Sequence, residues 1–129
     1  ACQCSTSGLL SGYCARKGLP ADAPMDGRIF FEAVHAGETE ANETLRSFCR
    51  AVAVQIYNLN VLLDLEKVAI GGGISAAEAL LPAIQAELDW LFERCTVMPT
   101  VKPELVRCRY GNDANMIGAL KLFFERNPA

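Results

Sequence analysis

The segment Val68-Ala69-Ile70-Gly71-Gly72-Gly73-Ile74-Ser75 decides the predicted fold. Its first three residues form an apolar run that is too short for a helix but suits a buried strand. Three glycines end that strand, and a helical pattern follows over residues 75–94, with a break expected near Pro82. A buried strand that leads through a glycine turn into a helix is typical of α/β proteins, which bind ligands beyond the carboxyl ends of their strands.

A second strand-to-helix turn follows further along the chain. Residues 104–109 alternate as a strand does, and Gly111-Asn112-Asp113 forms a turn that leads into a helix over residues 114–126. That helix carries an apolar face of Ile117, Leu120, Phe123 and Phe124. The order strand, helix, strand predicts a parallel sheet with both turns side by side in one crevice. Two strands do not make a stable sheet, so we expect further strands from sequence before Ala1 or from a partner chain.

The first half of the chain is predicted to be largely helical. Asp26 is a cap for a helix over residues 27–36, which ends at Gly37. Residues 38–63 place apolar side chains at helical spacing, with charges on the other face, and form the strongest helical pattern in the chain. Residues 18–28 have the composition of a loop. No helix is delimited before residue 27.

Two of these segments resemble motifs of the ROK family (repressors, open reading frames, kinases) of sugar kinases. Residues 68–75 resemble the adenosine motif of the actin-like kinase superfamily in its ROK form, and residues 111–120 resemble the C-terminal ROK motif. The resemblance implies an α/β fold: the C-terminal portion of an actin-like, ribonuclease H-like ATPase lobe, helix-rich with a partial sheet. Within this lobe fragment of residues 1–129, residues 1–27 hold a degraded cysteine motif and a loop, and residues 28–129 form the helical and nucleotide-side part.

The resemblance also implies a nucleotide site. In ROK kinases the glycine triplet lies against the adenosine of ATP and the second turn helps to build the pocket, which implies ATP and Mg²⁺ as cofactors. The implied binding residues are Gly71, Gly72, Gly73, Ile74, Ser75, Gly111 and Asn112. A glycine triplet alone is weak evidence, because such a triplet is more often a tight strand-to-helix turn that binds no ligand. We expect the family's phosphate loops, catalytic aspartate and Glu-x-Gly-His sugar motif upstream of Ala1, so no catalytic residue is assigned within this chain.

The cysteines near the N-terminus resemble the ROK zinc motif, Cys-x-Cys-Gly-x-x-Gly-Cys-x-Glu. Cys2, Cys4 and Gly8 match it, but Ser5 replaces its first glycine, Leu9 its third cysteine and Ser11 the glutamate that contacts the sugar in the family. A structural zinc site takes four nitrogen or sulfur ligands, and here Cys2 and Cys4 remain, with Cys14 as a displaced third. These departures argue against zinc. All six cysteines are expected to be reduced thiols rather than three disulfides, because half of them lie inside periodic apolar segments.

Composition excludes several classes of function. The formal net charge of −3 offers no basic stripe for nucleic acid, and no apolar run is long enough to cross a membrane. We therefore expect a cytoplasmic protein, and the resemblance implies a homodimer, with Tyr57, Trp90 and Phe92 as candidates for its contact surface.

The predicted function follows from the same resemblance. The intact protein is expected to be an ATP-dependent kinase that transfers the γ-phosphoryl group to a hexose or an N-acetylhexosamine. The segment of residues 1–129 would be inactive alone, because it has no carboxylate assigned as base. The alternatives are a sugar-sensing ROK repressor with an N-terminal DNA-binding domain, or a non-catalytic remnant.

Overall fold

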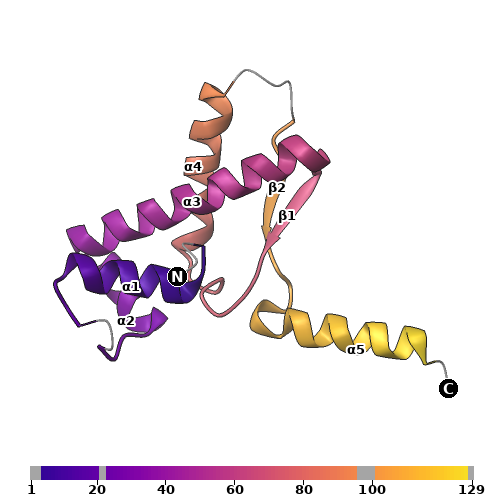
Figure 1. Cartoon of the computed structure of the whole chain (residues 1–129), viewed down its shortest axis with the longest axis horizontal. Coiled ribbons are helices and arrows are strands. Elements are labelled where there is room, and N and C mark those ends of the chain that lie inside the picture. Colours follow the sequence, from indigo (N-terminus) through magenta and orange to yellow (C-terminus); the bar gives the residue numbers. More distant parts are fainter. Residues whose placement is uncertain (1–3, 21–22, 96–100, 128–129) are drawn as a thin grey trace.

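The computed structural model describes residues 4–20, 23–95 and 101–127. The elements in chain order are α1 (Thr6–Arg16), α2 (Gly27–His35), α3 (Thr39–Leu63), β1 (Lys67–Ile70), α4 (Leu80–Arg94), β2 (Glu104–Arg107), the short 3₁₀ helix η1 (Gly111–Asp113) and α5 (Ala114–Arg126). Figure 1 shows α1 and α2 beside the first half of the long helix α3, with α5 projecting away from the other elements. The α/β, helix-rich class with a small sheet is confirmed. None of the described helices is both long and apolar enough to cross a membrane.

Helices α2 and α3 lie close to where the sequence predicts them. Asp26 caps α2, because its Oδ1 accepts a hydrogen bond from the Ile29 N–H at 2.9 Å. Gly37 follows this helix with a φ of +79°, which is the left-handed backbone that glycine adopts without strain. Helix α3 ends at Leu63, where Asp64 takes a left-handed conformation.

Helix α1 was not delimited from the sequence. Ser5 caps it by accepting a hydrogen bond from the Gly8 N–H at 3.1 Å, and Leu9 and Tyr13 lie one turn apart on its buried face. The Tyr13 hydroxyl donates to Glu38 at 2.8 Å, which ties α1 to the start of α3. Serines and glycines lower the intrinsic helix propensity of this stretch, so α1 depends on tertiary packing that its local sequence does not display.

The core lies between α3 and its neighbouring helices. Helices α3 and α4 share the largest interface, and α1 and α2 pack on the other part of α3. The largest side chains in this core that are fully buried are Phe30, Leu9, Leu80, Ile84 and Leu88. The proposed interface residues Tyr57, Trp90 and Phe92 are half-buried against the same core, and the rings of Tyr57 and Phe92 meet edge to face at 5.2 Å.

The sheet is parallel, as predicted, and has two strands among the described residues. β1 and β2 pair in the register Lys67 with Glu104 through Ile70 with Arg107. The predicted second strand was too long, because regular pairing ends at Arg107 and Cys108 already begins the turn. Cys108 still donates its N–H to the Ile70 carbonyl at 2.8 Å, which holds the ends of the two strands together.

The helix predicted from residue 75 begins five residues later, at Leu80. Residues 72–79 instead form successive turns, in which Ser75, Ala77 and Leu80 donate their N–H groups to carbonyls three residues earlier. Pro82 is the third residue of α4, where its missing N–H costs nothing because the first N–H groups of a helix have no partner within it. Ser75 therefore does not begin a helix, and the N-terminus of α4 lies seven residues beyond Gly73.

Candidate functional site

The glycine turn after β1 presents bare backbone to solvent. Gly71, Gly72 and Gly73 are exposed. Gly72 has a φ of +95°, which disfavours any side chain, and a Cβ at Gly71 would lie 3.0 Å from the Cys108 Sγ. Gly73 has no such constraint, because a Cβ there would meet no other residue within 4 Å. The first two glycines are thus required by the fold, whereas Gly73 leaves space that a ligand can use.

The two turns lie side by side, as the sequence predicts. The Gly72 N–H points to the Gly111 carbonyl at 3.5 Å, and Gly111 has a φ of +51°. Between the turns is a hollow of about 320 Å³, which we call the turn hollow. Its lining residues are Ala69, Gly71, Gly72, Cys108, Gly111, Asn112, Ala114 and Asn115. Four predicted site residues, Gly71, Gly72, Gly111 and Asn112, therefore come together, and Asn115 adds an exposed side-chain amide that the prediction left out.

A second hollow of about 670 Å³ lies between the glycine turn and α2, and we call it the α2 hollow. Gly73 and Ile74 form one wall, and α2 forms the other with Asp26, Gly27, Arg28, Phe31, Glu32 and His35. Arg28 and Glu32 form an exposed ion pair at 3.2 Å across this helix face. Sequence reasoning missed the α2 wall, because the residues that form it precede the glycine turn by about 40 positions and only tertiary packing brings them together.

Ile74 and Ser75 have structural contacts within the predicted site. The Ile74 side chain packs so close to α2 that a Cβ at Gly27 would lie 3.2 Å from its Cγ2. Ser75 is buried and donates its hydroxyl to the Gly72 carbonyl at 2.8 Å. Both residues therefore fix the shape of the turn, and Ser75 does not direct its hydroxyl outward.

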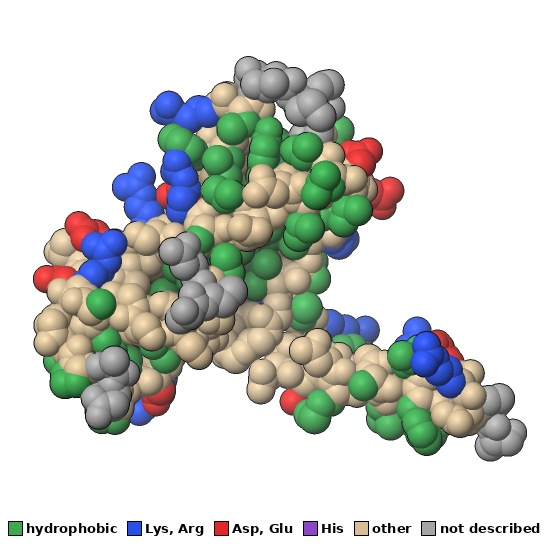
Figure 2. All heavy atoms as spheres, viewed as in Figure 1, with side chains coloured by type: hydrophobic (Ala, Val, Ile, Leu, Met, Phe, Trp, Pro, Cys, Tyr) green, Lys and Arg blue, Asp and Glu red, His purple; other side chains and the backbone are tan. Residues whose placement is uncertain are grey.

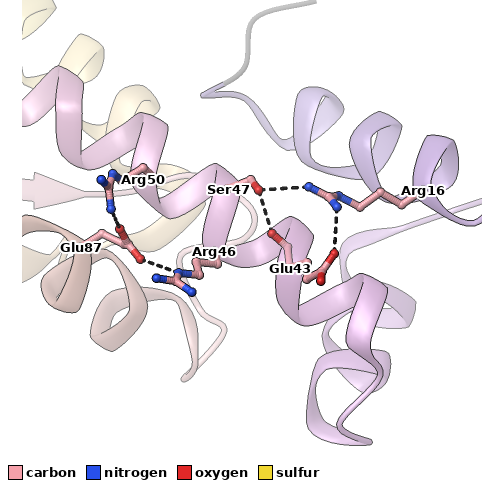
Figure 3. Close-up of polar contacts among 6 residues, drawn as sticks. All are labelled: Arg16, Glu43, Arg46, Ser47, Arg50 and Glu87. Atoms are coloured by element: carbon pink, nitrogen blue, oxygen red, sulfur yellow. Dashed lines mark hydrogen bonds and ion pairs between the residues drawn. The ribbon is translucent and has the colours of Figure 1, made fainter.

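Among the described residues, three carboxyl groups have a pKa below the ordinary range, and none of them lines either hollow. Burial alone would raise the pKa of Glu87, but hydrogen bonds from Arg50 at 2.7 Å and Arg46 at 3.1 Å outweigh burial and lower it. Figure 3 shows these contacts, which join α3 to α4. Hydrogen bonds from Lys17 and then Tyr13 lower the pKa of Glu38. In the same way, Lys102 lowers the pKa of Asp89. These groups join neighbouring segments of the fold, and the Glu87 pairs join two helices.

The cysteine motif is only partly described. Cys2 lies outside the described residues, and Cys4 is exposed. Leu9, which stands where the family has its third cysteine, is 1% exposed and belongs to the hydrophobic core. Across residues 4–20, 23–95 and 101–127 no three histidine, cysteine or acidic side chains are placed to hold a metal.

The other cysteines that the structure describes are not disulfide-bonded. Cys14 and Cys49 are buried, whereas Cys95 and Cys108 are half-buried. Burial, and secondarily the charge of Glu87, raises the pKa of the Cys49 thiol to about 12. Cys49 is therefore a small apolar core residue rather than a reactive thiol.

The chain is similar to proteins of one family over nearly its whole length. A family model described as the ROK family matches residues 1–126. N-acetylmannosamine kinase of Haemophilus influenzae (strain PittGG) is 27% identical over 124 residues, which cover 92% of this chain and 39% of that protein. Beta-glucoside kinase of Klebsiella pneumoniae is 28% identical over 127 residues, which cover 97% of this chain and 40% of that kinase.

A solved structure has the same fold. It is a ROK family protein from Streptococcus pneumoniae TIGR4 in complex with sucrose, with a TM-score of 0.83 and 24% identity. The match covers 95% of this chain and 41% of that one. This chain thus spans about two fifths of the length of these relatives.

Proposed function

The chain belongs to the ROK family, and we propose that it forms the adenosine side of the nucleotide cleft in an ATP-dependent sugar kinase. The observation that carries this proposal is the contact between the two glycine turns beyond the carboxyl ends of paired parallel strands. This edge is where α/β folds bind ligands. The kinase activity of the similar proteins supports the same reaction class.

We propose that adenosine lies along the Gly71–Gly73 backbone, with the turn hollow on one side of it and the α2 hollow on the other. The absence of other residues within 4 Å of a Cβ at Gly72 or Gly73 leaves room for close approach by a base or ribose. Asn112 and Asn115 offer exposed amides at the rim, which can donate to or accept from a ribose or phosphate. Backbone and amide groups of this kind hold a neutral nucleoside without adding charge.

Mg²⁺ does not fit the described residues of the turn hollow, because its lining includes no carboxylate. In the α2 hollow the Asp26 Oδ1 caps α2 and Glu32 pairs with Arg28. We therefore derive no step through the metal from these residues.

The proposed reaction is transfer of the γ-phosphoryl group to a hexose or an N-acetylhexosamine. Such a transfer needs a positioned hydroxyl and a carboxylate that accepts its proton. The described hollows supply neither a phosphate loop nor an unpaired carboxylate, so in a kinase of the relatives' length these groups would come from the part that this chain does not match. The role that remains for this chain is to bind and orient the nucleoside.

The substitutions in the cysteine motif favour an alternative to the kinase function. Leu9 replaces the third cysteine of the family motif and lies in the core, and Ser11, in place of the sugar-contacting glutamate, is exposed on α1. A non-catalytic remnant tolerates these substitutions more readily than a kinase does, and a ROK repressor that senses sugar is the other alternative. The complete reading frame separates these alternatives, since a DNA-binding segment would mark the repressor.

Calorimetric titration of the chain with ATP tests the proposed nucleotide role. Gly72→Val should weaken binding at least about tenfold, because a branched side chain would stand where adenosine approaches. Gly37→Val is the matched control, since Gly37 also has a positive φ of +79° and open space but lies away from both hollows. Equal affinity of the two folded variants would contradict the proposal.

A further inference from the structure

Three arginines cluster where α4 crosses α3 (Figure 1). Arg46 and Arg50 lie one turn apart on α3, and Arg94 belongs to the last turn of α4. Figure 3 shows Arg46 and Arg50 reaching the same carboxylate, that of Glu87. In Figure 2 basic side chains gather over these two helices, in the upper left of the view. We call Arg46, Arg50, Arg94 and the neighbouring Trp90 the arginine patch.

Trp90 brings two of these arginines together. The Arg50 Cζ lies 3.4 Å from the centroid of the Trp90 ring, and the Arg94 Cζ lies 4.6 Å from it. Since 3.4 Å and 4.6 Å together make 8.0 Å, the two guanidinium carbons are no further apart than that. Cation–π contacts and the Glu87 ion pairs restrict long side chains that would otherwise rotate freely. The patch is thus partly ordered before a partner binds, which reduces the entropy cost of binding.

The arginine patch is positive within a chain that is negative overall. Three guanidinium groups against the one carboxylate of Glu87 leave a local formal charge of +2, whereas the whole chain carries −3. Glu43 does not neutralise the patch, because it pairs with Arg16 at 2.9 Å. Glu93 is the acid next to Arg94 in the sequence, and it lies about 100° around the helix from that arginine. The local charge therefore favours a negatively charged partner.

Many N–H groups of the patch have no acceptor among the described residues. Arg46 donates only its Nε to Glu87, and Arg50 donates only its Nη1. Arg94 forms no ion pair with the described part of the chain. The Arg46 side chain is 77% exposed and Arg94 is exposed as well, so both present guanidinium groups to solvent. The planar fork of such a group matches the two oxygens of a carboxylate.

We propose that the arginine patch binds an acidic segment of another protein. Tryptophan and arginine are among the residues that contribute most binding energy at protein interfaces. The patch lines neither the turn hollow nor the α2 hollow, and it lies on the outer surface of two helices, which suits an extended segment better than an enclosed small molecule. Carboxylates at alternate positions of an extended segment are about 7 Å apart, close to the rise of about 6 Å between Arg46 and Arg50. The proposal does not depend on the nucleotide role.

Nucleic acid and a second copy of this chain are weaker partners. Binding to a phosphate backbone requires several basic side chains along a stripe, whereas a local charge of +2 neutralises few phosphates. A symmetric dimer that met at this patch would place arginines against arginines, because such contacts use the same surface of both copies. Like charges brought together in this way weaken an interface.

The fluorescence of Trp90 tests the proposal, because Trp90 is the only tryptophan in the chain. The probe is a peptide in which glutamate and serine alternate, and the control peptide has glutamine in place of each glutamate. The glutamate peptide should change the Trp90 emission saturably, and its binding should weaken as the salt concentration rises. The glutamine peptide and a short DNA duplex should leave the emission unchanged.

Two double variants show whether the arginines are responsible. Arg46→Gln with Arg94→Gln should weaken binding of the glutamate peptide about tenfold, and it keeps the Arg50–Glu87 ion pair. Lys121→Gln with Arg126→Gln removes the same charge from exposed positions of α5 and should change the affinity less than about twofold. Arg94→Gln alone, which breaks no ion pair of the described structure, should weaken binding about threefold.

Several results would overturn the proposal. They are an unchanged Trp90 emission at millimolar glutamate peptide, an equal response to the glutamine peptide, or equal affinities of the two double variants. A stronger response to the DNA duplex would assign the patch to nucleic acid instead. A dimer that the Arg46→Gln and Arg94→Gln changes dissociate would assign it to self-association. ATP is absent throughout, so failure here is distinct from failure of the nucleotide proposal.

Discussion

Replacing Gly71 by alanine should destabilise the chain, because the new Cβ has no room between the two turns. It would lie 3.0 Å from the Cys108 Sγ, 3.3 Å from the Cys108 Cβ and 3.5 Å from the Gly111 carbonyl oxygen. Optimal carbon contacts are about 3.5–4.0 Å, so the first two distances are overlaps. Cys108 cannot withdraw easily, since its N–H is bonded to the Ile70 carbonyl at 2.8 Å.

The magnitude follows from two opposing effects. Overpacking of this kind costs about 1–3 kcal/mol. Gly71 does not have a positive φ, so alanine also gains about 0.4–1 kcal/mol by restricting the unfolded chain. We expect a net loss of about 1–2 kcal/mol in the free energy of unfolding.

Urea unfolding of a double-mutant cycle measures this loss. Cys108→Ala removes the Sγ, and with it the 3.0 Å contact, so the double variant should recover at least about 0.5 kcal/mol relative to additivity. Gly73→Ala is the matched control, because a Cβ at Gly73 meets nothing within 4 Å. If Gly71→Ala were as stable as Gly73→Ala, or if Cys108→Ala brought no recovery, the described packing of the two turns would be wrong.

Three further outcomes follow from the structure. The lowered pKa of Glu87 means that its ion pairs stabilise the fold above the ordinary value of 4.5 and are lost as the pH falls through the folded pKa. Glu87→Gln should therefore lower the free energy of unfolding by about 1–2 kcal/mol at neutral pH, a figure already reduced for the solvent exposure of Arg46. The variant should also lose less stability than the parent chain as the pH falls. If the melting temperatures of the two proteins changed in parallel with pH, this expectation would be wrong. Chelation with EDTA should leave the melting temperature unchanged, since Leu9 fills the core where the family has a zinc ligand. A clear drop in melting temperature would instead show that a bound metal stabilises the chain. The chain alone should release no ADP from ATP in the presence of hexoses or N-acetylhexosamines, and sugar-dependent release above a control without protein would refute that expectation.

Local signals were sufficient to predict several parts of the fold. Asp26 and Gly37 mark the two ends of α2, because a cap and a left-handed turn depend on the residues at the helix ends. The glycine triplet and Gly111 predicted two adjacent turns, since parallel strands place their carboxyl ends at one edge.

Other parts depend on contacts that no local pattern encodes. Helix α1 has weak propensity and is held by Leu9 and Tyr13 against α2 and α3. The late start of α4 reflects successive turns stabilised by the buried Ser75, which local periodicity does not distinguish from a helix. The α2 wall of the larger hollow arises only when α2 packs beside Ile74.

A titration of the ¹⁵N-labelled chain with ATP, followed by amide chemical shifts, tests the proposed nucleotide site most directly. The amides of Gly71, Gly72 and Gly73, together with those of Gly111, Asn112 and Asn115, should shift first and saturate together. Titration with a hexose should leave them unchanged. Shifts confined to other elements, or no shift at any ATP concentration, would contradict the account that this chain binds adenosine between its two glycine turns.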